Sequence, residues 1–407
     1  MTQAVALSWL VLRITGNGVD LGLMTACTFG PLLLFGPYSG TLVDRFDRRR
    51  LLIVTQTLLL LLAALTATLI ATGVIRLWML FAIAVVTGFV NAPDGTARQV
   101  YVVDLVGTER LASAVSLYEV VLNISRVVGP GVGGALLATV GVAACCALNA
   151  ASYLQPLYVL LRHRPRPGIT VSADRTAPAA AARKAPRGQL RAGLRYAWRN
   201  RPIRVSLFLA AASGMLFNMG VTLPLLATRV FHLGGGGYGL MMAVFGVGAL
   251  PGALLASAGS GRPTGRSIGV LALGTAAAVL ATAAAPALWL VMLGLAVTGC
   301  LSIWFIAQAN TLVQLASDPS MRGRVMGLWT MALPGTEPAT SPFAGYISQT
   351  FGARDGFSLS GLALLITAAI GWRALTGRPS AVDLPADAVP AEPEPALTGR
   401  RARGPRA

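Results

Sequence analysis

A few ionisable residues lie inside long apolar runs of the sequence, where they could carry a proton. Glu119, Asn123 and Arg126 share one run at helical spacing, and Glu337 lies in another run, flanked by prolines. A charge at mid-bilayer costs about 2.5 kcal/mol or more on insertion scales, so each such residue needs a partner or a function. Apolar surroundings and a nearby arginine act on a carboxylic acid in opposite directions, which can bring its proton exchange close to neutral pH. These residues therefore predict proton transfer inside a membrane.

Glu119 and Arg126 are seven residues apart on one face of the predicted helix, with Asn123 between them. The two charges lie about 10 Å apart along the axis, too far for a direct ion pair but suited to a polar stripe that lines a cavity. We expect Glu119 or Glu337 to carry a coupling proton and Arg126 to adjust its affinity. The alternative is that these side chains form structural hydrogen bonds between helices.

The composition requires a membrane environment. The chain has 407 residues, of which 55% are hydrophobic and 12% charged, with a mean hydropathy of +0.66. Soluble proteins carry about 25% charged residues and could not bury this much apolar surface. Because apolar runs of about 20 residues recur along the chain, the sequence predicts an all-α polytopic membrane protein.

Twelve apolar runs follow one another. They cover 1–15, which is too short to cross alone, and 19–42, 51–73, 77–95, 112–138, 142–161, 203–227, 238–258, 268–285, 287–310, 325–348 and 356–375. The runs predict a six-helix half over 1–161, a linker over 162–201, a second six-helix half over 202–376 and a disordered tail over 377–407. The linker and the tail are rich in Pro, Ala and Arg.

A weak internal repeat supports the two halves. Gly36-x-x-x-Gly40-x-Leu42 recurs as Gly248-x-x-x-Gly252-x-Leu254, and Pro130-x-x-Gly133 recurs as Pro342-x-x-Gly345, both with an offset of 212 residues. Duplicated six-span units are how many transporters are built. The same offset places the residue that would match the start of the seventh span before Met1. By this comparison the first span is short at its N-terminal end, and we expect a truncated or misassigned start.

The net charge of +18 follows the predicted topology. The loops between runs form two alternating sets, and one set holds only Arg13, Arg76, Arg229 and Arg354. Arg126 falls inside a run. All other Lys and Arg residues fall in the opposite set of loops. The positive-inside rule places that set, the linker and the C-terminus in the cytoplasm of a cell-membrane protein. The charge therefore indicates topology and contact with anionic lipid rather than nucleic-acid binding.

Other chemistry finds little support in the sequence. The four cysteines lie in or beside apolar runs without metal-ligand spacing, and neither of the two histidines has a ligand partner nearby. No G-x-x-x-x-G-K-[ST] motif for nucleotide binding occurs. We expect no enzyme activity, no metal and no cofactor. The expected partners are a small-molecule substrate, protons and the lipid bilayer, and the chain is expected to act as a monomer.

A short charged loop joins the second and third runs. It reads Gly40-Thr-Leu-Val-Asp44-Arg45-Phe-Asp-Arg48-Arg49-Arg50 and resembles the G-x-L-a-D-R-x-G-R-R loop of the major facilitator superfamily. Gly40 allows close helix packing. In that superfamily the matching residues form a conformational latch between the two halves, which the resemblance implies for Gly40, Asp44, Arg45, Arg48 and Arg49. The alternative is a plain positive-inside anchor.

The fifth run carries Ser125-Arg126-Val-Val-Gly129-Pro130-Gly-Val-Gly133-Gly134. This resembles the G-x-x-x-G-P-x-x-G-G motif of proton-driven drug antiporters, with Ser125 in place of the first glycine. Proline removes one helix hydrogen bond and the glycines open a face, so we expect a bent and tightly packed helix at Gly129, Pro130, Gly133 and Gly134. The alternative is ordinary small-residue packing.

Between these motifs, Asp94-Gly-Thr-Ala-Arg98-Gln99 resembles the D-x-P-A-R-Q segment of the branch that contains enterobactin and macrolide exporters. We expect Asp94 and Arg98 to lie near the proton and substrate cavity with Glu119, Arg126 and Glu337.

The resemblances imply a major facilitator fold and a secondary transporter. The expected activity is export of small amphipathic compounds, of antibiotic or siderophore type, by proton antiport with alternating access. The alternatives are an importer or facilitator on the same fold, or a truncated membrane protein that does not transport.

Overall fold

The computed structural model describes residues 2–106, 111–162, 194–258, 263–318, 321–332 and 334–376. Contacts divide the chain into Met1–Thr376 and Gly377–Ala407. The predicted tail and most of the predicted linker lie outside the described residues. Within the described part almost every residue is helical, and nine segments are long and apolar enough to cross a membrane.

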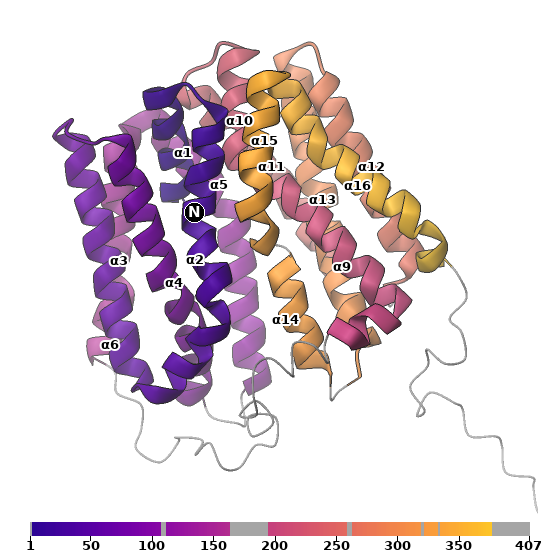
Figure 1. Ribbon diagram of the computed structural model, residues 1–407, viewed down its shortest axis with the longest axis horizontal. Helices are drawn as coiled ribbons and strands as arrows, with labels where there is room; N and C mark the ends of the chain where they lie inside the picture. Colours follow the sequence, from indigo (N-terminus) through magenta and orange to yellow (C-terminus); the bar gives the residue numbers. More distant parts are fainter. Residues whose placement is uncertain are drawn as a thin grey trace, which may run out of the picture. The chain divides into compact units, whose positions relative to one another are not determined.

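The first half of the chain forms α1 to α6, drawn in indigo to magenta in Figure 1. The helices are α1 Thr2–Thr15, α2 Gly18–Arg45, α3 Arg48–Ala71, α4 Leu77–Val106, α5 Leu111–Ser152 and α6 Leu154–Arg162. With 14 residues, α1 is about 21 Å long, shorter than the hydrocarbon core. Gly141 interrupts α5 with a φ of 80°: the predicted run 112–138 lies before this glycine, and the predicted run 142–161 covers the rest of α5 together with α6.

The second half forms the segments drawn in pink to yellow. They are α9 Arg201–Gly214, η2 Met215–Asn218, α10 Met219–Arg229, α11 Gly235–Ala258, α12 Gly265–Ala284, α13 Leu288–Ala316, α14 Arg322–Ala332, η3 Pro334–Thr336, α15 Glu337–Thr350 and α16 Ala353–Thr376. Shifted by 212 residues, α2, α3 and α4 fall on α11, α12 and α13. The helix bounds therefore follow the offset of the sequence repeat.

Polar residues fix where several helices begin. Asn17 accepts a hydrogen bond from the Val19 backbone N–H at 2.9 Å, and Asp47 accepts one from the Arg50 N–H at 2.8 Å. Thr264 and Ser267 form a reciprocal capping box on α12. Each cap satisfies N–H groups that the first turn of a helix leaves without a partner.

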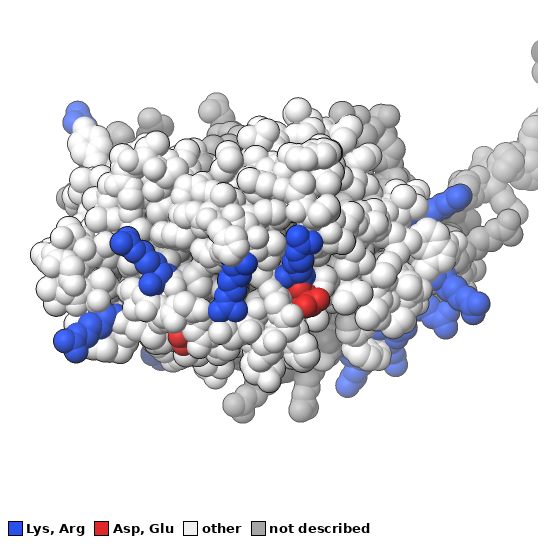
Figure 2. Space-filling view, turned by 90° about the horizontal axis from the view of Figure 1, so that it is seen from above, with Lys and Arg blue, Asp and Glu red and all other residues white. Residues whose placement is uncertain are grey.

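Most of the described arginines lie at helix ends on one side of the bundle, such as the end of α2 and the start of α3 at the lower end of Figure 1. This arginine-rich end carries Arg45, Arg48, Arg49, Arg50, Arg162, Arg204, Arg266 and Arg373. The arginine-poor end carries Arg13, Arg76, Arg229 and Arg354. Figure 2 looks onto the arginine-poor end from above and shows a surface formed largely of uncharged side chains.

The buried apolar residues form one core at the arginine-poor end and two cores at the arginine-rich end. The first core joins residues of α1 to α5 to residues of η2, α10 to α13 and α16. At the arginine-rich end, one cluster belongs to the second half and another, around Val43, Leu52, Ala97, Tyr101 and Leu160, belongs to the first half. Among the residues whose side chains the structure describes, the two halves therefore share a core at one end of the molecule and have separate cores at the other.

Candidate functional site

Two of the predicted spans are broken near their middle. The predicted span 203–227 divides into α9, the 3-10 turn η2 and α10, and the predicted span 325–348 divides into α14, η3 and α15. Pro334 and Pro338 flank the second break and cannot donate backbone hydrogen bonds. A break at this depth is tolerated where it lies inside protein or lines a cavity, and many transporters bind solutes at such breaks.

A polar cluster connects the two broken spans. The Asn218 amide donates to Thr340 Oγ1 at 3.0 Å, and the Ser341 hydroxyl donates to Asn218 Oδ1 at 2.5 Å. Asn218 and Ser341 are buried. Buried amides and hydroxyls are costly unless they are hydrogen-bonded, so this cluster fixes how η2 and α15 pack together.

Glu337 is the first residue of α15, about one turn before Thr340 and Ser341. No hydrogen bond or ion pair of the Glu337 carboxyl is found among the residues that the structure describes. Leu33 of α2 lies against the neighbouring turn η3, at 3.2 Å from the Cβ position of Gly335. Glu337 therefore starts a helix at a break that faces the other half of the molecule.

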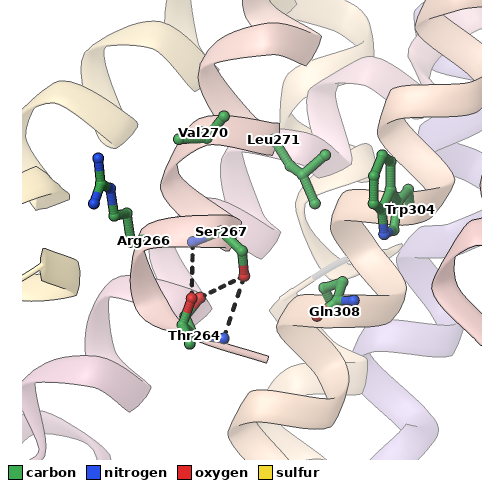
Figure 3. Close-up of a pocket in the computed structure, with 7 residues that line it drawn as sticks. All are labelled: Thr264, Arg266, Ser267, Val270, Leu271, Trp304 and Gln308. Atoms are coloured by element: carbon green, nitrogen blue, oxygen red, sulfur yellow. Dashed lines mark hydrogen bonds between the residues drawn. The ribbon is translucent and has the colours of Figure 1, made fainter. Parts of the chain in front are cut away.

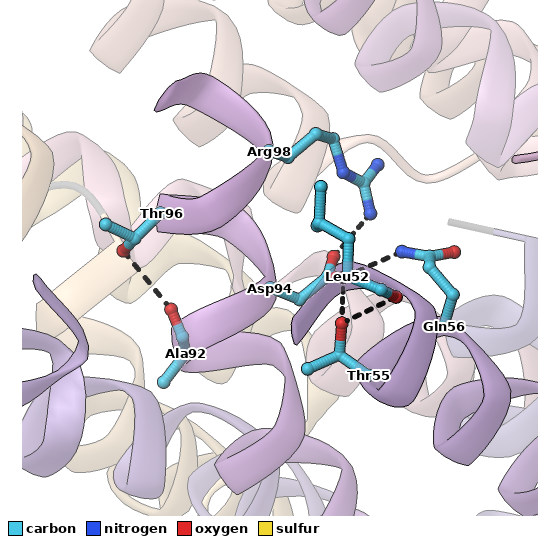
Figure 4. Close-up of polar contacts among 7 residues, drawn as sticks. All are labelled: Leu52, Thr55, Gln56, Ala92, Asp94, Thr96 and Arg98. Atoms are coloured by element: carbon cyan, nitrogen blue, oxygen red, sulfur yellow. Dashed lines mark hydrogen bonds and ion pairs between the residues drawn. The ribbon is translucent and has the colours of Figure 1, made fainter. Parts of the chain in front are cut away.

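Asp94 of α4 has a different environment, shown in Figure 4. Only 2% of Asp94 is exposed. Its Oδ1 accepts hydrogen bonds from Thr55 Oγ1 at 2.7 Å and Gln56 Nε2 at 2.8 Å, and its Oδ2 pairs with the Arg98 guanidinium one turn along the helix. This carboxylate joins α3 to α4 through three donors. The role that we predicted for Asp94 and Arg98 in a proton or substrate cavity remains a proposal.

The charged loop is a two-residue turn, Phe46 and Asp47, between α2 and α3. Arg49 reaches within its own half: its Nε donates to the Leu160 carbonyl at 2.7 Å and its Nη2 to the Leu161 carbonyl at 3.1 Å, at the end of α6. A cation at a helix C-terminus satisfies free carbonyls and complements the helix dipole. Arg45 is exposed. The latch between halves stays a prediction.

Gly134 of the antiporter-type motif lies on the backbone of the other half. A methyl group on Gly134 would be 2.1 Å from the Gly239 carbonyl oxygen of α11, and one on Gly239 would be 2.3 Å from the Gly134 oxygen. Gly133 is buried and Gly129 half-buried. Only glycine permits such close backbone contact, so this part of α5 forms one of the two seams between the halves.

The second seam joins α2 to α15. Methyl groups on Gly18 and Gly22 would lie 2.7 Å from the Gly345 oxygen and 2.4 Å from the Pro342 Cα. At the end of this seam, Gln349 Oε1 accepts from the Gly18 N–H at 3.1 Å, and Arg229 donates to the Gly16 carbonyl at 2.8 Å. Both seams are closed at the arginine-poor end.

A separate pocket of about 390 Å³ lies between α12 and α13 near the arginine-rich end. Figure 3 shows its lining, which includes Arg266, Ser267, Leu271, Trp304 and Gln308. The Trp304 indole N–H is buried without a hydrogen-bond partner in the described part of the chain. Because the lining comes from one half, this pocket is distinct from any cavity between the halves.

Several predicted site residues have side chains outside the described part. Gly40 and Asp44 belong to α2, and Glu119, Asn123, Arg126 and Pro130 belong to α5, but only their place in these helices is described. Asn218, Thr340 and Ser341 were not predicted from the sequence. An asparagine within an apolar run and three prolines in the predicted span 325–348 were the available signals.

Comparisons with known proteins give consistent matches. A family model described as transmembrane secretion effector matches residues 1–406. The multidrug efflux pump Tap of Mycolicibacterium fortuitum is 27% identical over 380 residues, 89% of this chain and 88% of that protein. The enterobactin exporter EntS of Citrobacter koseri is 27% identical over 376 residues, 90% of this chain and 82% of that protein. The staphyloferrin A transporter of Staphylococcus aureus is 30% identical over 135 residues, 33% of this chain and 34% of that protein.

Solved transporter structures share the fold. A bacterial homologue of the human lysosomal transporter Spinster, in an inward-facing and occupied conformation, has a TM-score of 0.70 at 14% identity, covering 92% of both chains. A D-xylose-proton symporter has a TM-score of 0.69 at 14% identity, covering 92% of this chain and 94% of that one. These matches confirm the predicted fold class, an all-α major facilitator fold.

The glycine seam predicts a difference between two positions on the same helix. Valine at Gly22 would collide with Pro342, whereas a methyl group at Gly30 has no atom within 4 Å. We expect Gly22→Val to open the arginine-poor end and Gly30→Val to leave it closed. Spin labels on the exposed residues Thr72 and Trp289, in a cysteine-free background, would measure the separation of the two halves. Equal distance distributions for both variants would contradict the seam.

The Asp94 cluster predicts coupled stability effects. Arg98→Gln leaves a buried carboxylate without its cation and should lower the free energy of unfolding by about 3 kcal/mol. Asp94→Asn combined with Arg98→Gln should be more stable than Arg98→Gln alone, because the buried charge is removed. Thermal unfolding of the four forms in detergent measures this coupling. Additive losses would show that the two residues are not energetically coupled.

Proposed function

Because this chain belongs to the transmembrane secretion effector family of major facilitator transporters, we propose that it exports small amphipathic compounds in exchange for protons. The substrates would be of antibiotic or siderophore type. The related proteins Tap and EntS are named as a multidrug efflux pump and an enterobactin exporter, which supports export over uptake. The protein is a multi-pass membrane protein, and the bacterial plasma membrane is the location that these relatives favour.

The division of the apolar core is the observation that carries this proposal. In the part of the chain whose side chains are described, the halves share one core at the arginine-poor end and have separate cores at the arginine-rich end. With the arginine-rich end and the C-terminus in the cytoplasm, as the positive-inside rule predicts, this arrangement corresponds to an inward-facing state. A substrate would enter from the cytoplasm, and breaking the two glycine seams would open the outer side.

Glu337 is the acid that we favour as the proton carrier. It lies at a helix break that faces the other half, next to the Asn218 cluster, and its carboxyl has no partner among the described residues. Protonation would neutralise the carboxyl and reduce the cost of enclosing it between the halves. The empty transporter could then return inward with a proton, and the substrate-loaded transporter would move outward without one. Glu119 and Arg126 on α5 remain the second candidates.

The proton assignment predicts which reactions Glu337→Gln would lose. In proteoliposomes with ethidium as the probe, uptake driven by an inside-acid pH gradient should fall at least tenfold, because the variant cannot exchange a proton. Ethidium counterflow, which requires no net proton movement, should remain. Asp355→Asn, an exposed acid at the start of α16, is the matched control and should keep both reactions.

Three outcomes would contradict this assignment. Normal driven uptake in Glu337→Gln would exclude Glu337 as the carrier, and the same loss in Glu119→Gln would move the role to α5. Loss of driven uptake and counterflow together would indicate a structural role for Glu337.

The direction of transport has its own test. Everted vesicles from cells that express the protein should accumulate ethidium when their interior is acidified, and collapse of the gradient by nigericin should release it. An importer would instead accumulate the probe in right-side-out vesicles. A chain that does not transport would give the same accumulation as vesicles from cells without it.

A further inference from the structure

A basic and apolar surface lies directly before α9, at the arginine-rich end. Residues 194–199 form a short helix that leads into α9. Leu194 and Trp198, one turn apart, are 50% and 57% exposed. Arg195 and Arg199 are also one turn apart and exposed, on the adjacent face, and Arg201 at the start of α9 is exposed as well. The sequence from 194 to 214 contains no acidic residue.

The orientation of this helix is fixed from its opposite side. Ala197 is buried in the core of the second half. The Tyr196 hydroxyl, on the face away from Trp198, accepts a hydrogen bond from the Asp318 backbone N–H at 3.1 Å. Asp318, the acidic residue nearest this helix among the described contacts, therefore lies on the Tyr196 side. Leu194 and Trp198 are held outward, away from the protein interior.

Trp198 is continuous with the membrane-facing surface of α9. Its ring contacts Phe208 edge to face at 5.9 Å, and 48% of Phe208 is exposed. Arg204 lies over the Trp198 ring at 5.7 Å and donates to the Trp198 carbonyl at 3.1 Å. The indole therefore stands at the boundary between an apolar strip and a group of guanidinium side chains. Amphipathic aromatic side chains favour this level of a membrane, where the lipid headgroups begin.

We propose that Arg195, Arg199 and Arg201, with Trp198, form a binding site for the headgroup of an anionic phospholipid. The guanidinium groups would pair with the phosphate and the negatively charged headgroup, because planar N–H donors match phosphate oxygens. The acyl chains would lie along Trp198 and Phe208. Basic residues near the membrane surface attract anionic lipid, so three of them favour an anionic over a zwitterionic lipid.

The site is tested by lipid binding to the purified full-length protein. Native mass spectrometry, with palmitoyl-oleoyl phosphatidylglycerol or phosphatidylcholine added to the detergent, gives the affinity for each lipid. Replacing Arg195, Arg199 and Arg201 together by Gln should weaken phosphatidylglycerol binding roughly tenfold or more and leave phosphatidylcholine binding unchanged. Replacing the same three residues by Lys should restore most of the preference, because the charge is retained.

A matched control separates this site from general attraction by the basic end. Arg50, Arg266 and Arg373 are exposed at the same end, and their joint replacement by Gln removes the same charge. The control variant should lose no more than about twofold in affinity. Equal losses in the two Gln variants, or no preference for phosphatidylglycerol in the unmodified protein, would overturn the proposal. Equal melting temperatures of the variants confirm that each is folded.

Discussion

Every backbone N–H and C=O group inside a bilayer must find its hydrogen-bond partner within the protein. This constraint explains why the described part of the chain is almost entirely helical, and it makes the places where the helices stop informative. η2 and η3 interrupt two spans, and Asn218 of η2 is hydrogen-bonded to Thr340 and Ser341 of α15, the helix that follows η3. This cluster lies inside the protein, where the second half faces the first, and broken helices are tolerated at membrane depth when they are buried in protein.

At the two seams the halves meet through backbone, and beside the seams side chains of both halves pack in the shared core. Gly134 against Gly239, and Gly22 against Pro342, bring helix backbones together with almost no side-chain volume between them. Such seams can separate and close again without the rearrangement of large rotamers, whereas each half keeps its own packed core at the arginine-rich end. Seams of small residues between two packed halves suit the rocking movement of the proposed mechanism.

The membrane spans and their order could be predicted from the sequence, because the length of an apolar run and the placement of charges are local signals. The predicted run 51–73 corresponds to α3, Arg48–Ala71, and the repeat offset matches the order of the helices. The helix breaks were missed because a hydropathy window averages over a single 3-10 turn. The partner of Gly134 and the bond between Asn218 and Ser341 join residues far apart in sequence. Neither the glycine motif around Gly134 nor the apolar run around Asn218 specifies which distant residue it contacts.

Glu337 occupies a position where opposing influences on a carboxylate meet. As the first residue of α15 it lies at the positive end of a helix dipole, which stabilises a negative charge. The apolar environment of a span favours the neutral form. On the proposed mechanism, opening one side of the molecule admits water to the break and favours the charged carboxylate. Closing that side favours the neutral carboxyl again. The same break in the helix would thus place the acid between the halves and make its charge respond to their movement.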